Sequence, residues 1–160
     1  MWDKFSSCLR SPAPRVSDEL LPTEITRGTK PYLERLARQI NGCYDFTFYD
    51  GCAVLCRRMI ESLLIGAFDK AGHLAAIQNT RDGNLMMLDG ILCQAKSGKY
   101  IRLPRGAATA IETIKKVGDT AGHDRYHVTT KQDIDDFRVD FRRVISQLLA
   151  MAGISASPSK

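Results

Sequence analysis

Apolar residues recur at spacings of three and four along most of this chain, and this periodicity most constrains what the chain can fold into. The last periodic stretch is the clearest, with Ile134, Phe137, Phe141, Ile145 and Leu148 on one side of a helix. No stretch of four or more residues alternates convincingly with a period of two, the pattern of a half-buried strand. We therefore expect an all-α fold, a bundle of four to five helices.

Turn and capping residues divide the periodic stretches. Asn41-Gly42, Ala71-Gly72 and Ser97-Gly98 are expected to end helices, and Thr130 with Asp133 resembles a capping box that begins the last one. Thr29 is a candidate cap for the first helix. The expected helices span residues 29–41, 46–70 or 49–70, 84–96, 107–122 and 130–153.

The two ends of the chain lack this periodicity. Residues 1–28 contain three of the prolines and no sustained period, so they are expected to form an irregular arm on the surface. Residues 154–160 are small and polar, which is typical of a flexible tail. One helical domain over residues 29–153 remains, in keeping with a length of 160 residues.

Charge and cysteine content limit the class of protein. Lys and Arg number 23 against 18 Asp and Glu, and the net charge of +5 is compatible with a phosphate-bearing partner but too small for an obligate nucleic-acid coat. The 5 cysteines are odd in number and form no Cys-x-x-Cys pair, which disfavours a disulfide framework and a structural zinc site. The longest apolar run, 59–68, is too short to span a bilayer, and Asp3 and Lys4 interrupt any secretory signal. We expect a cytoplasmic protein that needs no membrane and no cofactor.

The segment 115–127 holds most of the unusual chemistry. Lys115, Asp119 and His123 are successive i, i+4 neighbours on one helix face, beside Lys116. Such a face could bind a phosphate through lysine and move a proton through a histidine that the carboxylate orients. The alternative is an ordinary hydrogen bond between Asp119 and His123 that ends the helix.

A second charged group lies in the helix at 49–70. Arg57 and Arg58 are spaced four and three residues from Glu61, so either guanidinium could hold this carboxylate while it reaches a second partner. An ion pair that positions the helix against residues 107–122 is an equally good interpretation.

Other patterns carry weaker signals. His123 and His127 have the spacing of helical metal ligands, but Gly122 and Tyr126 indicate that the helix has ended, so we expect no metal site. A basic stretch could form a rim for RNA, although a solvated loop is the commoner explanation. Its residues are Lys96, Lys99, Tyr100, Arg102 and Arg105.

The order of three segments resembles the HEPN superfamily, in particular bacterial helical domains with an Arg-x-x-x-Glu or Arg-x-x-Glu helix and a late Gly-Asp/Asn-x-x-x-His segment. The matching stretches are Asn41-Gly42-Cys43-Tyr44, the helix from Arg57 to Leu64, and the segment from Lys116 to His123, within residues 30–152. The resemblance implies a helical homodimer whose two protomers bring their histidine segments to a shared cleft.

The resemblance also implies an activity for active members, which are metal-independent endoribonucleases of toxin or antiviral defence systems. His123 matches their histidine and Asp119 the polar residue before it, while Lys115 or Lys116 stands where an arginine is expected. Lysine lacks the bidentate guanidinium, which weakens the expected stabilisation of a phosphate transition state.

Two functions follow as expectations. In the first, the chain cuts RNA with His123 as the proton-transfer group and Asp119 orienting it, in a cleft lined by Arg58, Glu61 and Arg125. In the second, it is a non-catalytic HEPN-like module for dimerisation or for binding a protein from the same operon in a defence or restriction-type system.

Overall fold

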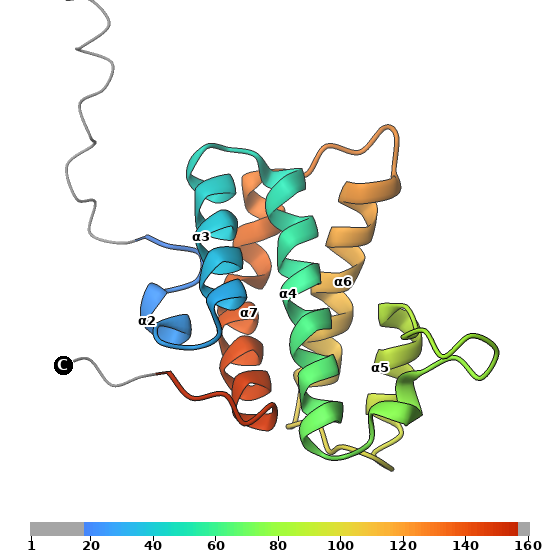
Figure 1. The fold of residues 1–160 in the computed structure, drawn as a ribbon. Coiled ribbons are helices and arrows are strands. Elements are labelled where there is room, and N and C mark those ends of the chain that lie inside the picture. Colours follow the sequence, from blue (N-terminus) through green and yellow to red (C-terminus); the bar gives the residue numbers. More distant parts are fainter. Residues whose placement is uncertain (1–17, 157–160) are drawn as a thin grey trace, which may run out of the picture.

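A computed structural model describes residues 18–156 of the chain as helices joined by turns, with one isolated β-bridge between Gln78 and Leu85 and no strand in that part (Figure 1). The expected all-α fold is confirmed. The helices are α2 (Thr23–Thr26), α3 (Pro31–Asp45), α4 (Tyr49–Lys70), the 3-10 helix η1 (Leu74–Ile77), α5 (Leu88–Lys96), α6 (Ala107–His123) and α7 (Lys131–Met151).

Four long helices, α3, α4, α6 and α7, form an antiparallel bundle (Figure 1). The turn from α3 to α4 and the loop from α6 to α7 both lie at the upper end in Figure 1, while α4 leads through η1 and α5 and returns at the lower end. Short connections force α3 and α4, and likewise α6 and α7, to run antiparallel, while the longer connection through η1 and α5 returns the chain to the lower end for α6. Side chains at the two ends of the bundle are therefore held about one helix length apart.

The core is formed by the apolar faces that the periodicity indicated. Leu63, Phe68, Ile111 and Phe141 are fully buried, as is Cys56 within the central helix α4. Burying each of the larger side chains stabilises the fold by about 1.5–3 kcal/mol before the entropy of ordering it is counted. Helix α4 contacts α3, α6 and α7, so a change in its position would alter the packing of all three helices.

The end of α3 differs from the expectation that Asn41-Gly42 would stop it. The helix continues to Asp45, because the side chain of Asn41 is used elsewhere: its amide donates to the carbonyl of Leu21 at 2.8 Å and its Oδ1 accepts from the N–H of Leu21 at 2.9 Å. Buried Tyr44 fixes the added turn against α7. The first helix also begins later than expected, with Lys30 and not Thr29 at the N-cap.

The segment before α3 is partly folded into the core. Leu20 and Leu21 are fully buried, and Arg142 of α7 donates to the carbonyl oxygens of Glu19 and Leu20. Residues 18–28, which include α2, thus differ from the expected irregular surface arm. Residues 1–17 of that arm, and 157–160 of the expected tail, lie outside the described residues.

Three helices end in the same hydrogen-bonded turn. In each, the N–H two residues past the C-cap returns to a carbonyl five positions earlier, and the residue between has a positive φ. Gly72 after α4 and Gly153 after α7 adopt this conformation without a Cβ penalty, whereas Thr47 after α3 adopts it at φ 63°. The expected break at Ala71-Gly72 and the capping box of Thr130 and Asp133 are both confirmed.

Candidate functional site

The close approach of α4 and α6 determines where the charged residues meet. A Cβ on Gly118 would lie 2.8 Å from Cβ of Arg57 and 3.0 Å from the carbonyl oxygen of Ala53, so only glycine fits at this crossing. The glycine lets the backbone of α6 rest against α4 and places Arg57 beside the next residue, Asp119.

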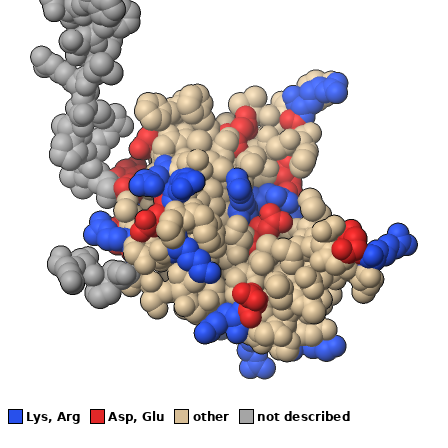
Figure 2. Space-filling model, in the orientation of Figure 1, with Lys and Arg blue, Asp and Glu red and all other residues tan. Residues whose placement is uncertain are grey.

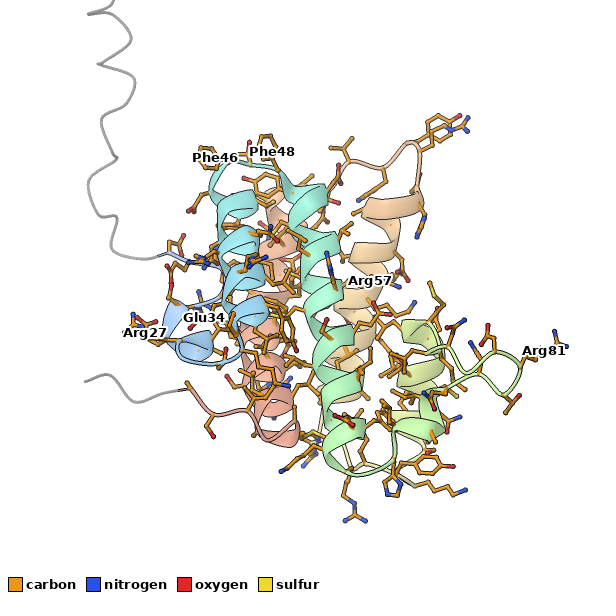
Figure 3. All side chains as sticks on the ribbon, in the orientation of Figure 1. Arg27, Glu34, Phe46, Phe48, Arg57 and Arg81 are labelled. Atoms are coloured by element: carbon orange, nitrogen blue, oxygen red, sulfur yellow. The ribbon has the colours of Figure 1, made fainter. Side chains whose placement is uncertain are left out.

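Five residues from three helices form what we call the charge cluster. Asp119 is its centre: Nε of Arg57 lies 2.6 Å from Oδ1 of Asp119, and Nζ of Lys115 donates to Oδ2 at 2.5 Å. The Nε–H of Arg57 is not aligned for a hydrogen bond, so this contact is an ion pair. Arg57, which projects from α4 in Figure 3, also reaches Glu61 at 3.8 Å, and Lys115 reaches Asp89 of α5 at 2.8 Å.

The charges in the cluster stabilise one another. Burial acts to raise the pKa of the Asp119 carboxyl, but the hydrogen bond from Lys115 and the charge of Arg57 outweigh it and leave the pKa below its ordinary value. Hydrogen bonds to Asp119 and Asp89 raise the pKa of Lys115. Both groups are therefore charged across the neutral range, and neither has the pKa near 7 that suits proton transfer.

A groove of about 450 Å³ lies between α5 and α6 next to the cluster. Two ion pairs span it, Lys115 with Asp89 and Lys96 with Glu112 at 2.5 Å. Lys116 also lines the groove, together with Asp119. The groove thus carries three lysines against three carboxylates and has no net charge to attract a phosphate.

The structure does not bring His123 to this site. Its side chain is exposed at the end of α6 and makes no hydrogen bond or ion pair with the described residues, while the carboxylate of Asp119 is engaged by Arg57 and Lys115. The expected pairing of Asp119 with His123 is therefore not formed. The physical reason is that a half-buried carboxylate gains more from two full positive charges than from an exposed imidazole.

Of the other predicted residues, some join the charge cluster and some do not. Glu61 forms an ion pair with Arg57, one of the two arginines expected to hold this carboxylate. Arg58 and Arg125 are exposed and pair with no described carboxylate, so the expected cleft of His123 with Arg58, Glu61 and Arg125 is not assembled within one protomer. Asp89 joins the cluster from α5 without having been predicted, because nothing in its local pattern indicates which helix it faces.

Exposed apolar side chains on two loops at the upper end of the bundle were also missed. The four side chains, which we call the apolar end, are Phe46, Phe48, Tyr126 and Val128, exposed to 72%, 66%, 88% and 72%. Figure 3 places Phe46 and Phe48 together on the turn between α3 and α4, and the loop from α6 to α7 that carries Tyr126 and Val128 lies at the same end of the bundle (Figure 1). The N–H of Thr129 at the end of that loop donates to Asp50 in the first turn of α4 at 2.9 Å. The sequence feature that could have indicated these exposed side chains is the presence of two phenylalanines, Phe46 and Phe48, beside a helix break.

No group of His, Cys, Asp and Glu residues among 18–156 is arranged to hold a metal ion. Within the same range no helix combines the length and the apolar character needed to cross a membrane. No family model, curated protein or solved structure matches this chain.

Proposed function

We propose that this chain is a non-catalytic, HEPN-like helical module that associates with a second copy of itself through the apolar end. The observation that carries the proposal is the exposure of Phe46, Phe48, Tyr126 and Val128, each by 66% or more, at one end of the bundle. Clusters of exposed large apolar side chains are uncommon on monomeric proteins and typically mark interaction surfaces.

The charge cluster supports a non-catalytic role. Asp119, Arg57 and Lys115 neutralise one another inside the protomer, and this arrangement joins α4, α5 and α6. A group that must stabilise a developing charge on a substrate has to be free to contact it. In this structure Asp119 and Lys115 are committed to structural contacts, whereas Lys116, the other candidate lysine, is exposed and forms no ion pair with the described residues.

The charges around the apolar end favour a second copy as the partner. Asp45, Asp124 and Arg125 are exposed and adjoin the apolar side chains in the sequence, whereas Lys131 is already paired with Asp135. Two copies related by a two-fold axis can therefore pair opposite charges around a shared apolar centre, as an isologous interface requires.

Sedimentation equilibrium tests the proposal. We expect the wild-type protein to form a dimer, and we expect Phe46→Ser with Phe48→Ser to be monomeric. Val139→Ser is the matched control, because Val139 is 75% exposed on α7, outside the apolar end. A wild-type protein that stays monomeric, or a control that dissociates as fully as the double variant, would contradict the proposal.

The non-catalytic part is tested separately. Wild-type protein and His123→Ala are incubated with mixed RNA in a chelator, and intact RNA is expected in both samples. Cleavage by the wild type that is lost in His123→Ala would show that the chain is a ribonuclease and that the shared cleft must form between protomers.

A further inference from the structure

In the short extended segment after α5, residues 99–105, buried or half-buried apolar side chains are interspersed with exposed cations. Ile101 is buried at 7% exposure and Leu103 is half-buried, so these two side chains hold the segment against the bundle. Lys99, Arg102 and Arg105 are exposed on its outer side. The apolar anchors fix a backbone whose charged side chains face solvent, in contrast to a loosely held basic loop.

Two further cations come to the same end of the bundle. Lys70 at the end of α4 packs over the turn at Gly153, where a Cβ on the glycine would lie 2.8 and 3.1 Å from carbons of the lysine side chain. Arg143 of α7 donates to the carbonyl oxygen of Arg105 at 3.4 Å. Figure 2 shows Lys and Arg gathered along the lower edge of the molecule. We call the five residues the basic end: Lys70, Lys99, Arg102, Arg105 and Arg143.

Most of these charges have no ion-pair partner among residues 18–156. No described carboxylate forms an ion pair with Lys70, Lys99, Arg102 or Arg105, and only Arg143 is paired, with Asp140. The charge cluster shows the opposite behaviour, since Arg57 and Lys115 each contact two carboxylates. Unpaired cations on several elements of one surface are available to an external polyanion.

An aromatic pair lies within this basic surface. The rings of His73 and Tyr100 are 5.4 Å apart, and the ammonium group of Lys99 lies 5.0 Å from the centre of the Tyr100 ring. Tyr100 is only partly buried and His73 is exposed. Proteins bind single-stranded nucleic acid by combining cations along the sugar-phosphate backbone with exposed aromatic rings. Bases stack on the rings while the phosphates contact the cations.

We infer that the basic end binds single-stranded nucleic acid, with the strand's phosphates on Arg102, Arg105 and Lys70 and a base against Tyr100. An anionic membrane is the less favoured partner, because none of the large apolar side chains that are exposed in residues 18–156 belongs to this end and could enter a bilayer. This binding site lies at the opposite end of the bundle from the apolar end and goes beyond the function proposed above.

Fluorescence anisotropy with a labelled 20-nucleotide RNA of mixed sequence tests the inference, with single-stranded DNA and a duplex of the same sequence beside it. For these three phosphate contacts we expect log K to fall with log salt with a slope of about −2. Replacing Arg102 and Arg105 by Gln should weaken binding by about tenfold or more at low salt and reduce that slope by about 1.4.

The matched control replaces Arg27 and Arg81 by Gln, which removes the same charge. Both are exposed, and Figure 3 places them at the two sides of the molecule, away from the basic end. Binding within about twofold of wild type is expected for this control. Tyr100→Leu should weaken binding of the single strand by roughly fivefold or more and leave competition by inorganic polyphosphate, which has no bases, unchanged.

The inference fails if the two pairs of substitutions weaken binding equally, since net charge alone would then explain it. It also fails if the wild type does not bind the RNA at low salt, or if phosphatidylserine vesicles bind more tightly than the single strand. Thermal unfolding of each variant identifies any loss of binding that comes from loss of the fold. The sedimentation result does not affect these outcomes, because the two surfaces share no residue.

Discussion

Replacing Gly118 by alanine should destabilise this protein, although the same change usually stabilises a helix. Alanine in a helix interior is favoured over glycine by about 1 kcal/mol. At Gly118 the added Cβ would lie 2.8 and 3.2 Å from carbons of Arg57 and 3.0 Å from the carbonyl oxygen of Ala53. The carbonyl belongs to the backbone of α4 and cannot move without displacing that helix.

The magnitude follows from setting these two effects against each other. Overpacking at a close contact typically costs about 1–3 kcal/mol, and here it also displaces Arg57 from Asp119. After the gain in helix propensity is subtracted, we expect Gly118→Ala to lower the free energy of unfolding by up to about 2 kcal/mol.

Gly122, one turn later in α6, provides the control. A Cβ there would meet only Cγ2 of Val54 at 3.7 Å, an ordinary contact, so Gly122→Ala should raise the free energy of unfolding by up to about 1 kcal/mol. Urea unfolding followed by circular dichroism measures both variants. If Gly118→Ala proves as stabilising as Gly122→Ala, the close crossing of α4 and α6 and the cluster built on it are wrong.

Two further predictions concern single residues. Asp119→Asn should destabilise the protein by about 1–2 kcal/mol, because Arg57 and Lys115 lose their shared carboxylate, whereas His123→Ala should change stability by less than about 0.5 kcal/mol. Since the folded pKa of Asp119 is lowered, its contribution is complete above the ordinary carboxyl pKa and is lost as pH falls through the folded value, so the difference between wild type and Asp119→Asn should shrink in acid urea titrations. An Asp119→Asn variant as stable as wild type at neutral pH would remove the cluster's structural role. Thr47→Gly should raise the free energy of unfolding by about 0.5–1 kcal/mol by relieving the positive φ, with Gly72→Thr losing a similar amount in the equivalent turn; thermal melts that show no gain for Thr47→Gly would refute this.

The helices were largely predictable because their signals are local. The apolar spacing from Ile134 to Leu148 and the pair Thr130 and Asp133 lie within a few turns of each other, and α7 forms where they indicate. The stop at Asn41-Gly42 was wrong because the side chain of Asn41 is satisfied by Leu21, twenty residues away, which a local pattern cannot show.

The candidate site was less predictable for a related reason. The i, i+4 spacing correctly placed Lys115 beside Asp119, but it is equally consistent with His123 on the other side. Asp119 is engaged instead by Arg57 on another helix. That contact depends on the close approach of the two helices at Gly118, which only the tertiary structure reveals. Asp89 and the apolar end likewise depend on which segments meet in space.

The antiparallel connectivity has a geometric consequence for how two copies would work together. The phenylalanine-bearing turn and the arginine-bearing segment lie at opposite poles, separated by a helix of 22 residues, or about 33 Å. Two protomers joined pole to pole at their phenylalanines would hold their arginines roughly 66 Å apart, facing away from each other. Such an assembly would tether two separate strands, or two distant stretches of one, and could not close around a single short one.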